Sequence, residues 1–227
     1  RQQTSIYLAD PQLGGVFSQL GWTGSLIQPE CPARFGGGCY KDYLYQVEAN
    51  IGVNKINQHI LSRITHSIQI TPERVEHTRQ IKYTNNAQSP SWPLGLYKTY
   101  LRFYVNAESI VAGVMVNKES LESKYITEYL DHNRKVIGIV VAVPIESEIE
   151  VVVKYYTSHQ IKKGESYFFF EQSQPGVMNR LSSIALTHPD NLRAELISPL
   201  VEVNQNQVVV TSDQGVGFLA IQFAKEQ

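Results

Sequence analysis

Two cysteines are the residues of this 227-residue chain whose type and spacing most directly predict a chemical bond. Cys31 and Cys39 lie in one loop rich in proline and glycine, close enough to be bridged without help from the rest of the fold. A local disulfide is the favoured interpretation, and it would indicate an oxidising, extracytoplasmic setting. Two free thiols in a cytosolic loop are the alternative. A zinc site is disfavoured, because it needs four ligands and no histidine lies near this loop in the sequence.

Histidines and closely spaced carboxylates are the other candidate ligands. His66 and His77 lie on strands that we expect to pair, so the two rings are expected to face each other. Two ligands without a third do not make a metal site, and we predict a hydrogen-bonded or solvent-facing pair, with no metal or cofactor. Glu146, Glu148 and Glu150 recur at a period of two, which favours a solvated sheet face over a calcium site because the Asp-rich calcium loop is missing.

Catalytic signatures are weak throughout the sequence. A Gly-x-Ser-x-Gly nucleophile elbow does not occur. Paired carboxylates of the glycosidase type meet only in the folded protein, and nothing in the sequence singles out such a pair. We therefore predict no catalytic residue, and we expect that this chain is not an enzyme.

An aromatic residue in a turn-rich loop is the best candidate for binding. Trp92 lies between Pro90 and Gly95, and binding residues commonly lie on loops that a rigid scaffold positions. We select Trp92, Tyr97 and Lys55 as candidate binding residues. The alternative is that the Trp92 loop plugs the open end of the core and that Lys55 has only a structural role.

Composition excludes several classes of partner. The formal net charge is −1 and no block of like charge occurs, whereas a nucleic-acid or anionic-membrane site normally leaves a basic footprint. No apolar run approaches the roughly 20 residues that span a bilayer, so we expect no membrane insertion by this chain. A hydrophobic content of 42% with 13 Tyr and 8 Phe is sufficient for a core and favours sheet.

The N-terminal quarter of the chain has a mixed pattern. Asp10-Pro11 supplies a helix cap followed by proline at the first helical position, and apolar residues then recur at helical spacing. Residues 5–9 and 22–27 are expected to be short strands on either side. We therefore predict that residues 1–55 are the C-terminal remnant of an α/β domain with one short helix.

After Ile56 the pattern changes to a period of two. Residues 60–70 and 75–83 alternate between apolar and polar side chains on either side of a turn at 71–74, which predicts a hairpin. Strand-length segments separated by turn residues continue to the C-terminus, with no gap long enough for crossover helices. We predict a mainly β fold, in which residues 56–227 form an antiparallel β-sandwich, immunoglobulin-like or larger, preceded by the short α/β segment.

Four stretches carry a resemblance to a known family. They are Val47–Asn57, Ile81–Asn86, Tyr97–Val105 and, more loosely, Gln172–Gly176. Through them the chain resembles the C-terminal part of the bacterial family named domain of unknown function 4012. The cysteine loop departs from that family's pattern, so the predicted disulfide depends on the loop argument alone.

The resemblance implies a bacterial cell-surface setting. Members of the family are secreted or membrane-anchored, and their larger N-terminal α/β domain is similar to the LytR-CpsA-Psr ligases, which attach glycopolymers to cell walls. That region would lie upstream of Arg1, so no catalytic residue is carried over to this chain.

Two functions are therefore weighed. The first is a non-catalytic extracytoplasmic β-sandwich module of a membrane-anchored bacterial surface protein, with a structural role or with a cell-envelope polysaccharide or surface protein as partner. The alternative is the accessory half of an enzyme acting on cell-envelope glycopolymers. A pocket that gathers two or more carboxylates or arginines would favour the alternative.

Overall fold

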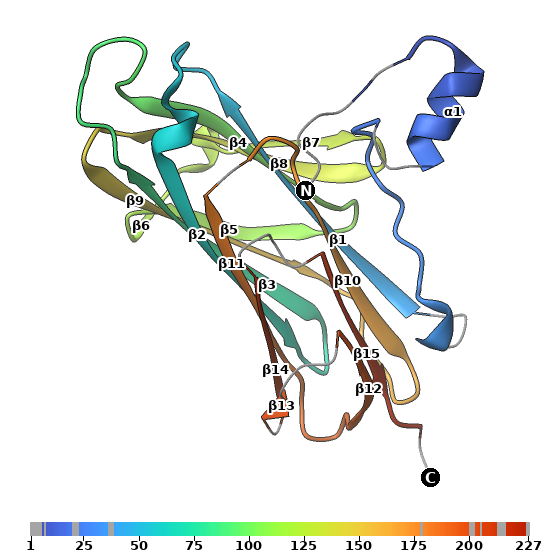
Figure 1. Cartoon of the computed structure of the whole chain (residues 1–227). Coiled ribbons are helices and arrows are strands. Elements are labelled where there is room, and N and C mark those ends of the chain that lie inside the picture. The colour runs from blue at the N-terminus through green and yellow to red at the C-terminus, as the bar shows by residue number, and fades with distance from the viewer. Residues whose placement is uncertain are drawn as a thin grey trace.

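The computed structural model describes residues 6, 8–19, 23–35, 39–177, 179–199, 203–204, 206–212 and 217–225. Strands dominate the chain after residue 38 (Figure 1). The elements are α1 (Pro11–Gln19), η1 (Ala33–Phe35), β1 (Cys39–Asn50), η2 (Ile56–His59), β2 (Ile60–Ile70), β3 (Val75–Asn85), β4 (Tyr97–Asn106), β5 (Ile110–Val116), β6 (Glu119–Ser120), η3 (Ser123–Tyr125), β7 (Thr127–Asp131), β8 (Arg134–Val143), β9 (Ser147–Thr157), β10 (Ser166–Gln172), β11 (Arg180–Thr187), β12 (Ala194–Ser198), β13 (Val203–Asn204), β14 (Gln207–Ser212) and β15 (Phe218–Phe223).

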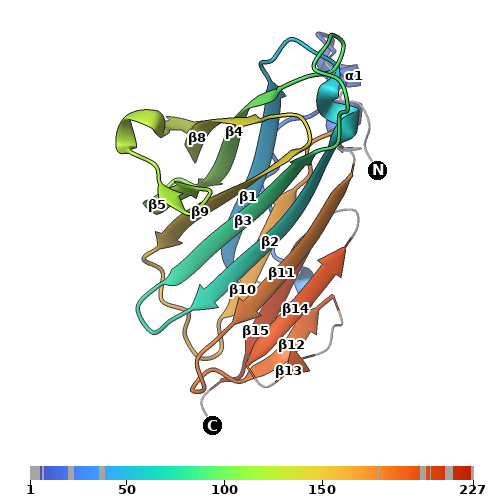
Figure 2. The ribbon, with the colours of Figure 1, turned by 90° about the vertical axis from the view of Figure 1, so that its left-hand side faces the viewer.

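Two sheets pack face to face, which confirms the predicted β-sandwich (Figures 1 and 2). Sheet A has the order β12-β15-β10-β1-β4-β8-β7, and sheet B has the order β13-β14-β11-β2-β3-β9-β5-β6. Most strand pairs are antiparallel, as predicted, but the sheets are mixed, because β1 pairs with β10 and β2 pairs with β11 in parallel. Side-chain alternation reports which face of a strand is buried but not the direction of its neighbour, and these partners are far apart in the sequence.

The predicted β2–β3 hairpin explains how the core forms. In β2 every second side chain, from Ile60 to Ile70, is buried while the residues between them are mostly exposed. The register runs from Ile60 opposite Asn85 to Ile70 opposite Val75, and the turn closes where the Thr71 N–H donates to the Arg74 carbonyl at 2.9 Å. The inward residues of both sheets form one apolar cluster between the layers.

The α/β expectation for the N-terminal segment is correct for the helix only. The Asp10 carboxylate accepts from the Gln12 N–H at 2.8 Å and from the Leu13 N–H at 3.1 Å, as a helix cap does. Ile6, Leu8 and residues 23–27 are not in strands, while residues 5, 7 and 22 of the two expected strands lie outside the described residues.

Segment 23–35 covers part of the outer face of sheet A instead of forming a strand. The Ile27 N–H donates to Gln172 Oε1 at 2.9 Å, and Gln172 Nε2 donates to the Ser25 carbonyl at 3.0 Å. The side-chain amide of Gln172 on β10 thus makes hydrogen bonds to backbone groups of this segment that a neighbouring strand would make in a sheet. Leu26 packs against Tyr43 and Tyr104 on the same face.

Strand β1 belongs to the sandwich although it precedes residue 56. It lies between β10 and β4 inside sheet A, with Leu44 in the central core. The sandwich therefore includes residues 39–50, on the N-terminal side of the boundary expected after residue 55.

Candidate binding site at the Trp92 rim

Four loops meet at one end of the sandwich, and we call this end the Trp92 rim. The loops are 51–59 after β1, 86–96 after β3, 144–146 after β8 and 173–177 after β10. Strand register places them together, because Asn50 is opposite Thr99 and Tyr97 is opposite Val143. The short helix η2 and the loop from β3 to β4 lie at the top of Figure 1, and the C-terminus lies at the opposite end.

Asparagine side chains hold the first two loops together. Asn50 Nδ2 donates to Asn57 Oδ1 at 2.7 Å and to Asn54 Oδ1 at 3.0 Å, and Asn54 Nδ2 donates to the Leu96 carbonyl at 2.8 Å. These are the turn residues of the Val47–Asn57 stretch. Their amides take the role that ladder hydrogen bonds have inside the sheets.

The three selected binding residues all lie at this rim, but they differ in exposure. Trp92 is 75% exposed and Lys55 is also exposed, and the Lys55 N–H donates to the Pro93 carbonyl at 2.8 Å. Tyr97 is buried, and its hydroxyl donates to Glu48 Oε2 at 3.0 Å. Trp92 and Lys55 are therefore presented to solvent from adjoining loops, whereas Tyr97 is part of the structure beneath them.

Exposed aliphatic side chains lie on the first two loops of the rim, 51–59 and 86–96. Ile51, Val53 and Leu96 are exposed, and Val53 reaches 88%. Val53 also has φ of 54°, a left-handed conformation that is a genuine outlier for a β-branched residue. Strain of this kind persists where the surrounding structure imposes it, and it occurs preferentially at binding sites.

A pocket of about 310 Å³ opens beside these loops. Its polar lining comes from Glu48, Asn57, Gln58 and Gln174, and Tyr97 and Ile60 contribute to its wall. The volume is at the lower end of the range for small-ligand sites. Only one of its lining residues is a carboxylate and none is an arginine, so this pocket does not meet the criterion for the enzyme alternative.

Both oxygens of the Glu48 carboxylate are already in use. Oε1 accepts from Arg180 Nη2 at 2.8 Å and from Gln46 Nε2 at 2.7 Å, and Oε2 accepts from Tyr97. Burial, together with the charge of Glu48, raises the pKa of Tyr97. With three donors on its two oxygens, the Glu48 carboxylate is held in place by the surrounding side chains and shapes the pocket.

A chain of polar side chains continues from Glu48 into the core. Gln46 Oε1 accepts from Arg79 Nη2 at 3.0 Å, and Arg79 Nη2 also donates to Glu171 Oε1 at 2.6 Å. Deeper still, Asp42 Oδ2 accepts from the Tyr167 hydroxyl at 2.7 Å and lies 2.9 Å from His77 Nε2. We did not predict this chain. The signal was the run of polar residues at 42, 46 and 48 on one face of β1.

The predicted pairing of His66 with His77 is confirmed. His66 Nε2 lies 3.1 Å from His77 Nδ1, both side chains are buried, and the His77 ring stacks on Tyr155 at 4.5 Å between centroids. Among the residues that the structure describes, no group of three or more His, Cys, Asp or Glu is placed to hold a metal ion. The carboxylates at 148 and 150 interact with Lys82 and Gln80, as expected of a solvated sheet face.

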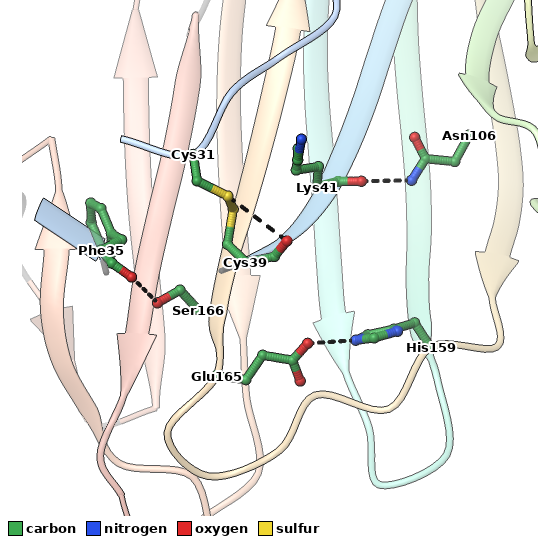
Figure 3. Close-up of a disulfide and its surroundings, with 8 residues drawn as sticks. All are labelled: Cys31, Phe35, Cys39, Lys41, Asn106, His159, Glu165 and Ser166. Atoms are coloured by element: carbon green, nitrogen blue, oxygen red, sulfur yellow. Dashed lines mark hydrogen bonds and ion pairs between the residues drawn. A yellow bond between two sulfur atoms is a disulfide. The ribbon is translucent and has the colours of Figure 1, made fainter. Parts of the chain in front are cut away.

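The predicted disulfide joins Cys31 to Cys39, with 6.1 Å between the Cα atoms (Figure 3). It fastens segment 23–35 to the start of β1, next to the 3.3 Å hydrogen bond from Ser166 Oγ to the Phe35 carbonyl. The bond suggests an oxidising environment outside the cytoplasm. No helix in the described part of the chain is long and apolar enough to cross a membrane.

Comparisons with known proteins give no relative from which a function can be transferred. No family model and no curated protein matches the sequence. Among solved structures, an M1 zinc metallopeptidase from Deinococcus radiodurans matches 73% of this chain and 43% of its own at 10% identity and a TM-score of 0.40. Yeast LTA4 hydrolase in complex with bestatin matches 72% of this chain and 29% of its own at 6% identity and a TM-score of 0.44.

In both matches this chain therefore spans less than half of the solved chain. Neither TM-score reaches 0.5, and neither likeness bears on the function of this chain.

Proposed function

We propose that this chain is a non-catalytic, extracytoplasmic binding module of a bacterial cell-surface protein, and that the Trp92 rim contacts a cell-envelope polysaccharide. The observation that carries the proposal is the exposure of Trp92 on a loop whose backbone is fixed by hydrogen bonds to its neighbours. An exposed indole ring leaves a large apolar surface in contact with water, and a bound ligand would cover that surface. Tryptophan is among the residues that contribute most to binding free energies.

The chemistry of the rim supports a sugar ligand. The amide side chains of Asn57 and Gln58 are exposed beside the pocket, and amides both donate and accept hydrogen bonds as sugar hydroxyls require. The ring of Trp92 offers a flat surface on which the C–H face of a sugar can stack. The disulfide supports the extracytoplasmic part of the proposal, and the resemblance to the domain of unknown function 4012 family supports its surface setting.

The competing function is an accessory half of an enzyme that acts on the same class of polymer. Its support would be a concave site with several free carboxylates or arginines, and the only carboxylate of the rim pocket, Glu48, is saturated by its three donors. The binding function is therefore the better supported of the two.

Cosedimentation with purified bacterial cell-envelope polysaccharide tests the proposal. Trp92→Ala is expected to weaken binding about tenfold or more, as loss of a hot-spot aromatic does, while changing the free energy of unfolding by less than about 0.5 kcal/mol. Val209→Ala, at an exposed position on β14, is the matched control and should bind like the wild type. Equal binding by Trp92→Ala and the wild type would overturn the assignment of the rim.

A further inference from the structure

The outer face of sheet A carries a tyrosine-rich surface centred on Arg102. Across the sheet, Tyr45 is opposite Tyr104, Tyr104 is opposite Val136, and Val136 is opposite Tyr129. Four residues further along the strands, beyond the row that contains Arg102, Ala49 is opposite Tyr100 and Tyr100 is opposite Val140. We call Tyr45, Tyr100, Arg102, Tyr104, Tyr129 and Val140 the tyrosine face. Tyr104 is its buried member, 7% exposed, and Leu26 packs against its cluster.

Backbone contact at Gly138 keeps one of these rings against the sheet. A Cβ atom at Gly138 would lie 2.9 Å from Tyr100 Cζ, a distance that real Cβ atoms essentially never show. The ring of Tyr100 thus occupies the space that a side chain on β8 would take. Because Gly138 has no side chain, the Tyr100 ring can lie close against the backbone of β8.

Arg102 is the cation at the centre of this surface. Its guanidinium carbon lies 5.5 Å from the Tyr100 ring centroid and 6.0 Å from that of Tyr104, and Nη1 donates to the Tyr104 hydroxyl at 3.4 Å. Within the described part of the chain no carboxylate pairs with it, and its Nε is buried without a hydrogen-bond partner.

The carboxylate on the adjoining edge strand is already engaged. Asp131 Oδ2 accepts from the Tyr104 hydroxyl at 3.3 Å, and Asp131 Oδ1 lies 2.6 Å from His132 Nδ1. An unsatisfied N–H and an unpaired charge are both costly when they are shielded from water. Among the described residues Arg102 therefore has a hydroxyl acceptor but no carboxylate partner, and a ligand that carries a carboxylate would supply one to its guanidinium.

We propose that the tyrosine face binds a polysaccharide that carries carboxylate groups, with Arg102 as the anchor for one carboxylate. Guanidinium groups bind carboxylates through two parallel hydrogen bonds, and aromatic ring faces flank Arg102 on the same surface. Three strand intervals separate Tyr45 from Tyr129, so the surface extends about 14 Å across the sheet and suits an extended polymer.

The inference rests on the proposed function, from which it takes a polysaccharide as the ligand. It adds that this polysaccharide is acidic and that a second surface of the chain contacts it. Tyrosine and arginine are also common at protein–protein hot spots. A polysaccharide is favoured here because Tyr45, Tyr100 and Tyr129 are at least partly exposed, and because Arg102 has no carboxylate partner among the described residues. A sugar acid offers C–H faces, hydroxyls and a carboxylate together.

Titration calorimetry of the wild-type chain provides the first test, since it requires no variant to fold. Polygalacturonate should bind about tenfold or more tightly than its fully methyl-esterified form, because esterification removes the charge that Arg102 requires. Raising NaCl from 0.1 to 1 M, which shortens the Debye length from about 10 to about 3 Å, should weaken binding of the acid form. Equal affinity for both forms, or no binding of either, as expected if a protein covers this face, overturns the inference.

Variants locate the site and separate the inference from the proposed function. Arg102→Met should reduce the affinity for polygalacturonate about tenfold or more, and Arg102→Lys should recover only part of it because lysine lacks the fork. Arg63→Met removes the same charge from an exposed position on β2 of sheet B and should leave the affinity within about twofold of the wild type.

Trp92→Ala supplies the last comparison. If Trp92→Ala abolishes binding and Arg102→Met does not, the proposed function stands and the inference is overturned. If neither variant changes the binding of any polysaccharide, both are overturned.

Discussion

Arg79 and Glu171 form an ion pair between the two sheets, with Nη2 of the arginine 2.6 Å from Oε1 of the carboxylate. Both side chains are buried, with at most 3% of their surface exposed. Arg79 is on β3 of sheet B and Glu171 is on β10 of sheet A, so the pair joins the two layers. Gln46 on β1 also accepts from Arg79. A charge pair in this position restricts how the two sheets can slide past each other.

Removing one partner of this pair should be strongly destabilising. Arg79→Met is expected to lower the free energy of unfolding by about 3–5 kcal/mol, because it leaves the buried Glu171 carboxylate without its hydrogen-bonded partner. Guanidinium chloride unfolding measures the change. Lys82→Met is the control, since the Lys82–Glu148 pair is exposed on the outer face of sheet B, where an ion pair is screened by water and should contribute little. Similar losses in the two variants would contradict this account.

Acid should destabilise the fold through His66. Burial, then the charge of Arg79 and then His77, lowers the pKa of His66 well below 6.5. Below pH 6.5 the unfolded chain binds a proton at this position that the folded chain does not, so the free energy of unfolding falls as the pH falls. One such proton accounts for up to about 1.4 kcal/mol per pH unit.

Urea unfolding at pH 7.5, 6.5 and 5.0 measures this dependence. The charged and titratable groups next to His66 are Arg79 and His77, both on β3. The ring of Tyr155 on β9 also packs against His66. Asp42 contacts His77 and is linked to His66 through that ring. His66→Phe removes the titrating group and should give a shallower slope between pH 6.5 and 5.0 than the wild type. Parallel slopes for the two proteins would exclude His66 as the source.

Reduction of the disulfide should loosen the N-terminal segment. Cys31 and Cys39 are eight positions apart in the sequence. In the chain-entropy model, a cross-link that closes a loop of this size stabilises the folded chain by about 2.5 kcal/mol. A double Cys31→Ser, Cys39→Ser variant should unfold at correspondingly lower denaturant, and protease should cleave segment 23–35 first. Intact-mass measurement with and without reductant checks the bond itself, since equal masses would show that the purified protein carries no disulfide.

Sequence alternation predicted the existence of most strands but misleads about β1. Polar residues at 42, 46 and 48 alternate with Tyr43, Tyr45 and Val47, a pattern that normally places the polar side chains in water. In the structure Asp42, Gln46 and Glu48 point between the sheets, and Tyr43 packs on the outer face beneath Leu26. The reversal is possible because the inward polar groups find buried partners on other strands, which no single-strand pattern reveals.

The candidate site residues also divide into those that the local sequence identifies and those whose role depends on the fold. Trp92 and Lys55 could be selected from turn chemistry because exposure of a loop follows from its local sequence. Tyr97 sits in a strand, and its partner Glu48 is 49 residues away, so its buried role depends on the fold. Arg102 was not singled out, because its lack of a carboxylate partner among the described residues, and of an acceptor for its buried Nε, becomes visible only when the neighbouring strands are in place.

The contact between Gly138 and Tyr100 provides a test of the geometry of the outer face. Gly138→Ala would place a methyl group against the ring of Tyr100, so the ring must move, and the free energy of unfolding should fall. Tyr100→Ala removes the obstacle, and in the double variant the alanine at 138 should cost less than it does alone, which gives a coupling energy measurable by a double-mutant cycle. Gly113→Ala is the control, since a Cβ there meets no heavy atom within 4 Å. Additive effects of Gly138→Ala and Tyr100→Ala would show that the ring does not rest on β8.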